Sequence, residues 1–189
     1  GFYFKNQDLF INVKKNLDIS YTSKNIWSKY NEGNIELMLF FNQLGDGRMA
    51  NIPWLQELPD PINRTCWDNY LCVSKKLADK LELKNKVSPD GQMDGDIVTL
   101  KLNGLEIKNI PVFIQPGHSD ESVSLALGYG RTKSGKSGDN VGVNAYPFYK
   151  NANLDQGVVE IIKQEKETHE FASVQLAHTM MGRDIVKES

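Results

Sequence analysis

The chain has 189 residues, a formal net charge of −2 at pH 7, 40% hydrophobic residues and 24% charged residues. These values are typical of a globular protein with one domain, or with one domain and an appendage. They exclude the broad basic surface that nucleic-acid binding requires, so we expect no nucleic-acid partner. No apolar run approaches the roughly 20 residues that a membrane-spanning helix needs.

The chain contains only the cysteines Cys66 and Cys72. An iron–sulfur cluster usually takes four cysteines, and a structural zinc ion takes four cysteine or histidine ligands. The histidines, at positions 118, 169 and 178, lie far from the cysteine pair in sequence. We therefore expect no metal ligands on this chain, and either two thiols or one short disulfide.

The chain starts at Gly1 without an initiator methionine or a signal peptide, and aromatic residues follow directly. This start predicts a piece of a longer polypeptide, whose compartment cannot be read from its own terminus. Residues 1–33 are polar and rich in Asn and Lys, so we expect an irregular segment with one short strand at Leu9–Val13. Residues 34–189 are expected to form a single domain.

An apolar run at residues 34–42 predicts the first strand of the domain. Residues 50–69, which we call the strap, follow it and combine Trp54, Trp67 and three prolines in a polar stretch. Proline fixes φ, removes a backbone donor and pushes the preceding residue to extended geometry, so we expect neither a helix nor a regular strand there. Such a segment is typical of a lid over a site or of a connection that docks one domain on another.

Ser74 is placed to cap a short helix whose apolar face carries Leu77, Ala78 and Leu81. From there the pattern changes to short alternating runs with turn signals between them. These runs predict strands at residues 97–102, 105–114, 122–127, 141–148 and 157–162, with residues 171–176 pairing with the last.

Three turn signals separate these runs. Asn103-Gly104 predicts a two-residue hairpin, Asn109-Ile110-Pro111 predicts a break in the returning strand, and Pro116-Gly117 predicts a further turn. With roughly seven or eight short strands, the sequence predicts a mainly β fold with one or two short helices and long irregular loops. That content suits a closed β-barrel better than a βαβ sheet.

Residues 130–137 match the phosphate-loop pattern G-x-x-x-x-G-K-[ST] at every position. Phosphate binding also needs backbone amides that converge at the start of a helix. The following residues, 138–144, are glycine-rich and form a poor helix, and no downstream strand ends in an aspartate that would hold magnesium. We therefore interpret residues 128–140, the glycine loop, as a cationic surface loop and not as a nucleotide site.

Several segments, in their order and spacing, resemble the C-terminal domain of molybdopterin oxidoreductases of the dimethyl-sulfoxide-reductase superfamily. The resemblance covers about residues 34–186 and is closest to the iron–sulfur subunit of alternative complex III, a quinol:electron-acceptor oxidoreductase. The segments that carry it are Gly47–Asn51, Trp54–Pro59, Trp67–Asn69, Ser74–Leu83, Gly95–Val98, Gln115–Gly117, Leu127–Arg131 and Gly142–Tyr146.

The resemblance implies a double-psi β-barrel that, in the superfamily, grips the pterin dinucleotide. The molybdenum ligand comes from another domain in such enzymes, so no catalytic residue is implied here. Where dinucleotide-holding members carry a phosphate-contacting segment rich in His, Thr and Arg, this chain has the strap with Glu57 and Asp60. Like charges in a poorly solvated groove repel phosphates, so we expect no cofactor on this chain, with molybdopterin guanine dinucleotide as the alternative.

The candidate cofactor-binding residues are Asn51, Gln56, Gly128, Tyr129, Arg131 and Asn144. The three amide side chains can hydrogen-bond a guanine or pterin edge, or tie irregular backbone together, which is the interpretation we favour. Arg131 can pair with a pyrophosphate or with a carboxylate on a partner domain. Gly128 permits a close backbone approach, and Tyr129 is placed to point into a cleft. Trp54 and Trp67 can stack on a cofactor or anchor an interface, but burial in the core is expected.

Three functions follow as expectations. The first is a structural, cofactor-free domain of a respiratory oxidoreductase subunit, in contact with an iron–sulfur domain of the same polypeptide and with cytochrome c and membrane subunits. By resemblance, its place would be the periplasmic face of a bacterial inner membrane. The second is a domain that binds molybdopterin guanine dinucleotide in an active molybdenum enzyme. The third is a stand-alone protein-interaction barrel.

Overall fold

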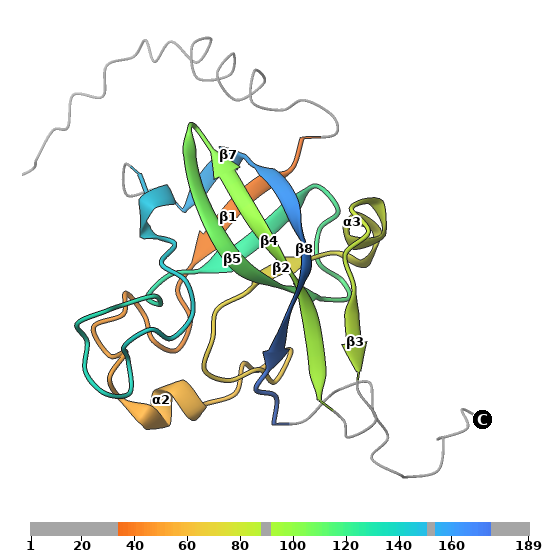
Figure 1. Cartoon of the computed structure of the whole chain (residues 1–189). Coiled ribbons are helices and arrows are strands. Elements are labelled where there is room, and N and C mark those ends of the chain that lie inside the picture. The colour runs from red at the N-terminus through yellow and green to blue at the C-terminus, as the bar shows by residue number, and fades with distance from the viewer. Residues whose placement is uncertain (1–33, 88–91, 151–153, 175–189) are drawn as a thin grey trace, which may run out of the picture. The chain divides into compact units, whose positions relative to one another are not determined.

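The computed structural model describes residues 34–87, 92–150 and 154–174. Contacts divide the chain into the units Gly1–Glu32 and Gly33–Ser189, and the predicted strand at Leu9–Val13 lies outside the described residues. The second unit is mainly β, as the sequence predicts, with a mixed sheet and short helices (Figure 1). In chain order its elements are β1 (Glu36–Phe40), α2 (Pro53–Glu57), β2 (Leu71–Val73), α3 (Lys75–Lys80), β3 (Asn85–Val87), β4 (Met93–Leu102), β5 (Leu105–Ile114), β6 (Ser122–Ala126), the 3₁₀ turn η1 (Tyr146–Phe148), β7 (Asp155–Val158) and β8 (Glu160–Phe171).

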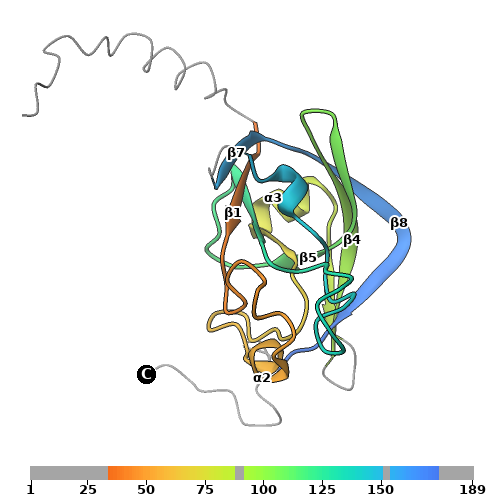
Figure 2. The same cartoon turned by 90° about the vertical axis from the view of Figure 1, so that its left-hand side faces the viewer.

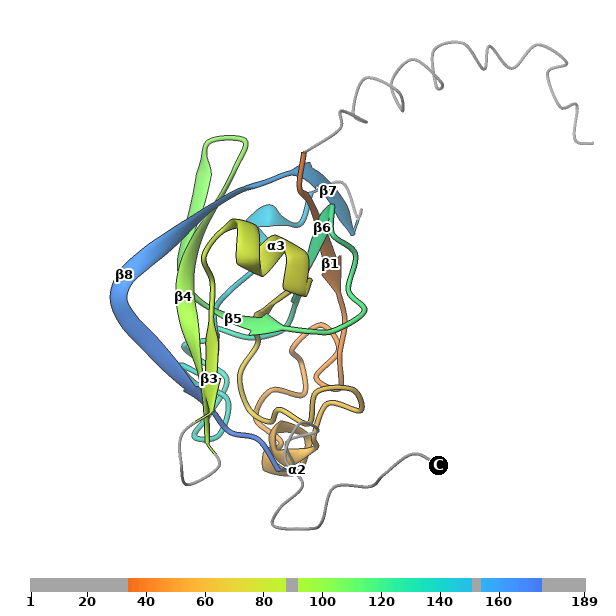
Figure 3. The same ribbon diagram turned by 90° about the vertical axis from the view of Figure 1, so that its right-hand side faces the viewer.

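The strands form one sheet in the order β3-β4-β5-β2-β6-β1-β7, and β8 pairs with β4 off this path. Two pairs are parallel, β1 with β6 and β2 with β5, while β2 and β6 are antiparallel. The described sheet is not closed, which differs from the predicted closed barrel. In β8, residues 164–167 lie opposite Ile97 alone, and the strand bows outward (Figures 2 and 3).

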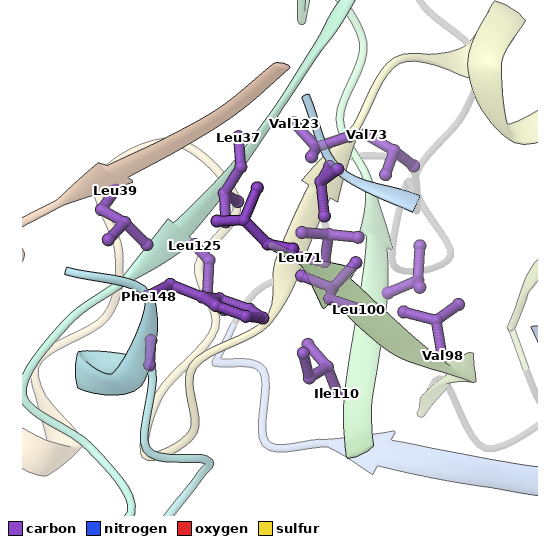
Figure 4. Close-up of a cluster of buried hydrophobic side chains, with 14 of the residues drawn as sticks. Leu37, Leu39, Leu71, Val73, Val98, Leu100, Ile110, Val123, Leu125 and Phe148 are labelled. Atoms are coloured by element: carbon purple, nitrogen blue, oxygen red, sulfur yellow. The ribbon is translucent and has the colours of Figure 1, made fainter. Parts of the chain in front are cut away.

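The main core lies inside the curve of the sheet (Figure 4). Alternation places Leu37 and Leu39 of β1 inward while Met38, between them, remains 47% exposed. On β2 the two faces serve different clusters, because Leu71 and Val73 join the main core and Cys72 joins a second one. The residues shown at the centre of the main core are Leu37, Leu39, Leu71, Val73, Val98, Leu100, Ile110, Val123, Leu125 and Phe148.

Three local predictions are confirmed. The Oγ of Ser74 accepts a hydrogen bond from the backbone N–H of Leu77 at 3.0 Å and so caps α3. Asn103 and Gly104 have φ values of 49° and 77° in the turn between β4 and β5. The predicted break at residues 109–111 is a β-bulge, since the partners of Val98 and Leu100 are Ile110 and Ile107 and Asn109 has φ 60°.

Three element predictions are wrong. The strap contains a one-turn helix, α2, because Pro53 stands at its start, where a missing N–H costs nothing. Residues 141–148 form no strand, and end instead in the turn η1. Phe171 does not pair with residues 157–162, because it ends the same long strand, β8, and pairs with Met93 of β4.

Candidate functional site

The predicted site residues lie in loops at one end of the sheet, residues 42–58 and 128–148, which we call the loop layer (Figure 1). The topology explains why these loops meet. Because β1 and β6 are parallel neighbours with Phe40 opposite Ala126, the two chains leave the sheet side by side. The N–H of Leu127 still donates to the carbonyl of Phe40 at 2.8 Å, so the loops start from a shared anchor.

The carbonyl oxygen of Asp46 joins the two loops. It accepts hydrogen bonds from Nη2 of Arg131 at 2.9 Å and from the hydroxyl of Tyr146 at 2.7 Å. A Cβ on Gly47 would lie 2.5 Å from the carbonyl oxygen of Gly128 and 2.6 Å from Nε of Arg131. The loops therefore approach so closely that position 47 requires glycine, whose φ here is +88°.

The guanidinium of Arg131 bonds to a backbone carbonyl and forms no ion pair among the described residues. Among the described residues it has no carboxylate partner, and its buried Nε has no hydrogen-bond partner. The carboxylate of Asp46 pairs instead with Arg48, whose backbone amide and guanidinium lower the pKa of Asp46. Whether Arg131 also meets a phosphate or a carboxylate from outside the chain stays a prediction.

Tyr129 does not point into a cleft, contrary to expectation. Its side chain is 3% exposed and packs with Leu44, Ala50 and Ala126 in a small cluster. The hydroxyl accepts a hydrogen bond from Nδ2 of Asn42 at 2.7 Å. Burial raises the pKa of Tyr129 to about 12, so the phenol keeps its proton. The residue stabilises the base of the loop layer.

The three candidate amide side chains hold backbone together, as expected. Oδ1 of Asn51 accepts from the backbone N–H of Ser137 at 3.0 Å, and Oδ1 of Asn144 accepts from that of Tyr146 at 3.0 Å. Gln56 is 1% exposed and donates to the carbonyl of Ala50 at 2.8 Å, while its Oε1 has no partner.

The glycine loop already binds an anion of its own. Backbone amides of Ser134 and Gly135, which a phosphate loop would direct at a nucleotide, donate to Oδ1 of Asp139. No helix follows Ser137 in the described part of the chain before the short turn η1. The carboxylate of Asp139 thus takes the place that a phosphate would need, which agrees with our interpretation of this motif.

These contacts test whether the loop layer fits a pterin dinucleotide. The predicted hydrogen-bonding groups of Asn51, Tyr129 and Asn144 each have a partner within the chain. A ligand that used the same oxygens would compete with these bonds, whereas the buried Nε of Arg131 and Oε1 of Gln56 have no partner. Whether the loop layer holds the dinucleotide therefore stays a prediction.

The strap presents Trp54 to solvent, so its predicted burial in the core is wrong. Its exposed fraction is 82%, because α2 turns Gln56 inward and leaves the tryptophan on the outer side. Trp67 is half-buried with φ 67°, and its N–H donates to the carbonyl of Gln56 at 2.8 Å. Three further apolar side chains of the strap are at least 43% exposed, namely Ile52, Leu58 and Ile62, and so is Met49 just before it.

Sequence reasoning missed the polar residues that fasten the loop layer to the sheet. Asn69 is 1% exposed, donates from Nδ2 to the carbonyls of Ala126 and Val143, and accepts from the N–H of Val143. Its neighbour Asp68 lies 2.9 Å from Nε2 of His169 on β8. Nothing local in the sequence indicates these contacts, because each joins positions more than 50 residues apart.

Cys66 and Cys72 are both free thiols and both buried. Burial raises the pKa of each, in the case of Cys72 to about 12, so neither is a reactive thiolate. Across residues 34–87, 92–150 and 154–174, no group of three or more His, Cys, Asp and Glu side chains is placed to hold a metal ion. In the same ranges, no helix has the length and hydropathy to cross a bilayer.

The sequence matches no protein-family model, and it matches no curated protein. The loop layer must therefore be interpreted from its own contacts.

Proposed function

We propose that this chain is the C-terminal molybdopterin-dinucleotide-binding-like domain of a respiratory oxidoreductase subunit, and that it serves as a structural module without a cofactor. The proposed subunit type is the iron–sulfur subunit of a quinol:electron-acceptor oxidoreductase of the alternative complex III kind. The sequence resemblance across residues 34–186 is the basis of this assignment. The proposed partners are an iron–sulfur domain of the same polypeptide, cytochrome c and membrane subunits, at the periplasmic face of a bacterial inner membrane.

The finer fold that we propose is the double-psi β-barrel. It is supported by the parallel pairs β1/β6 and β2/β5, of which the second lies within the first along the chain, and by the antiparallel pair β2/β6 that links them. Parallel pairs need long crossover connections, and residues 74–104 supply one between β2 and β5 while residues 41–121 supply the other between β1 and β6. A two-sheet sandwich of simple hairpins would not produce this pairing.

The structural role rests above all on one observation: the carboxylate of Asp139 occupies the amides of the glycine loop. A domain that gripped a pyrophosphate would keep such donors for its ligand. The strap adds negative charge nearby in Glu57, which is exposed, and in Asp60, which accepts from the amides of Ile62 and Asn63. Both features support a loop layer whose hydrogen-bond donors are used within the chain and not for a dinucleotide.

The exposed strap supports docking on another domain. A tryptophan that is 82% exposed beside Met49, Ile52 and Leu58 is unusual for a free surface and typical of an interface. We expect Trp54→Ala in the full-length polypeptide to reduce co-purification of the partner subunits at least tenfold while the subunit itself still folds.

Val158→Ala on β7 is the matched control, since Val158 is 44% exposed and β7 lies at the opposite end of the domain from α2 (Figure 1). Equal recovery of the partners with both variants would refute docking through the strap. If the polypeptide proved to end close to residues 1 and 189, the same surface would belong to a stand-alone interaction module.

A second candidate is a domain that holds molybdopterin guanine dinucleotide in an active enzyme. It is favoured by Arg131, whose buried Nε lacks a partner and whose guanidinium pairs with no carboxylate of the described chain. Molybdenum analysis and pterin fluorescence of the full-length protein separate the two functions. We expect both signals to be far below one equivalent, and a stoichiometric signal would overturn the structural role.

A further inference from the structure

A cavity of about 1090 Å³ opens on the side of the domain that carries β3 and α3. Its lining comes from α3, from residues 82–87, from the ends of β4 and β5, and from Ile62 and Asn63 of the strap, and includes no residue of the loop layer. Small-molecule sites in proteins occupy roughly 300–1,000 Å³ and are mostly apolar with a few polar groups. The cavity is therefore large enough for a whole ligand, and nothing in the proposed function uses it.

The inner wall of the cavity is apolar and rigid. Leu83, Met93 and Phe113 line it and are 2%, 4% and 7% exposed. Phe113 is held from behind by Tyr70 and Phe171, with ring centroids 5.4 Å and 5.6 Å away. Such a wall is formed before any ligand arrives, which lowers the entropic cost of binding.

The rim of the cavity has an excess of positive charge. Four lysines line it together with two acids, and these residues are Lys75, Lys84, Lys86, Lys163, Asp79 and Glu82. Two of the lysines are already paired, one with Asp79 and the other with Asp96 at 2.7 Å.

Lys84 and Lys86 make no ion pair with any described residue. The acids around them are Glu82 on the cavity lining, Asp94, which lies opposite Lys86 in the sheet, and Asp96, whose carboxylate accepts from the backbone N–H of Lys84. Lys84 directly precedes β3 and Lys86 lies on it, and both residues line the cavity. Their ammonium groups can therefore meet one anionic group at the mouth of the cavity.

We propose that this cavity binds a small amphiphilic anion, a molecule with an apolar body and one carboxylate. The apolar body contacts Leu83, Met93 and Phe113, and the carboxylate meets Lys84 and Lys86. An added peptide strand fits less well, because β3 has only three residues and its lysine, Lys86, discourages pairing along a sheet edge.

Decanoate, with decanol as the uncharged probe of equal chain length, tests this on the full chain by isothermal titration calorimetry. We expect decanoate to bind with one site and more tightly than decanol. Lys84→Gln/Lys86→Gln should weaken decanoate binding by about five- to tenfold, the effect of two partly screened charge contacts. Lys133→Gln/Lys136→Gln on the glycine loop removes the same charge elsewhere and should leave the affinity unchanged.

Val87→Trp gives an independent test, since Val87 lines the cavity and is 44% exposed, so a larger side chain can be added without disturbing the core. We expect this variant to lose decanoate binding while its circular dichroism stays that of the unsubstituted chain. The proposal is overturned if decanoate does not bind at millimolar concentration. It is equally overturned if decanol binds as well as decanoate, or if both double variants weaken binding to the same extent.

Discussion

The carboxylate of Asp68 lies 2.9 Å from the imidazole of His169, although 101 residues separate them. The second oxygen of Asp68 accepts a hydrogen bond from the N–H of Gly142 at 3.0 Å. One carboxylate therefore joins the end of the strap, the far half of β8 and the segment that follows the glycine loop. The loop layer is held against the sheet at this point and at Asn69 beside it.

Asp68→Ala should lower the free energy of unfolding by about 1–3 kcal/mol, because it removes two hydrogen-bond partners at a half-buried position. Urea denaturation followed by circular dichroism measures the change. Asp79→Ala is the matched control, since the Asp79 side chain is 61% exposed and its ion pair with Lys75 lies on the surface of α3. We expect that control to change stability by less than about 0.5 kcal/mol, and a similar loss in both variants would contradict the role of Asp68.

Gly130→Ala should be much more costly than Gly104→Ala. Both glycines have a positive φ, +68° and +77°, so both substitutions carry the same kind of backbone strain. A Cβ at position 130 would lie 2.1 Å from the backbone nitrogen of Asn144, whereas nothing lies within 4 Å of one at position 104. Thermal and urea unfolding should place the difference at about 1–3 kcal/mol, the cost of overpacking. Equal losses would mean that the two loops do not touch at Gly130.

Asp139→Ala should loosen the glycine loop without creating a nucleotide site. The amides of Ser134 and Gly135 lose their acceptor, and no helix is present in the described part of this loop to direct them at a phosphate. Trypsin should then cut faster after Lys133 and Lys136, while the cutting rate after Lys101 in the β4–β5 hairpin stays the same. ATP and GTP should give no calorimetric signal at micromolar concentration with either form, and micromolar binding would reverse our interpretation of residues 130–137.

The free energy of unfolding should fall as the pH rises from about 9 towards 12. Burial raises the pKa of Cys72 from 9.0 to about 12 and that of Tyr129 from 10.0 to about 12. The unfolded chain therefore releases these protons at lower pH than the folded chain, so the stabilisation is complete below pH 9 and is lost towards pH 12. Urea titrations at several pH values measure the slope, which should be smaller in Cys72→Ala and in Tyr129→Phe. Unchanged slopes in both variants would show that other groups control the alkaline transition.

Local signals predict local structure well in this chain. The cap at Ser74, the Asn103-Gly104 hairpin and the strands β1 and β6 depend on residues within a few positions of one another, and they are found within two residues of the expected bounds. Strand β4 begins at Met93, four residues before the predicted start at residue 97. The bulge at Asn109 is also a local feature, since the sequence Asn109-Ile110-Pro111 predicts a break in the strand. In contrast, the sequence pattern predicts two short strands where the structure has the single strand β8. The charged residues of β8 interrupt the apolar alternation that identifies a strand, and only the pairing with β4 shows that the strand is continuous.

The candidate site shows the same division. The sequence alone singles out the loops that meet at one end of the sheet, since glycines, prolines and tryptophans accumulate there for reasons of backbone geometry. It does not indicate that Tyr129 is buried, that Trp54 is exposed or that Asp139 fills the amides of the glycine loop. These facts depend on which segments the parallel pairs bring together, and hydrogen bonds across such distances leave no local pattern.

The amino-acid sequence by itself determined that the domain is mainly β, where most turns fall, and that the strap and the glycine loop are its unusual segments. Only the tertiary structure decided what those segments do: one carries an exposed tryptophan, and the other binds its own carboxylate. The reason is physical, because backbone preferences act between neighbours in the chain, whereas burial and long-range hydrogen bonds exist only after the strands have paired.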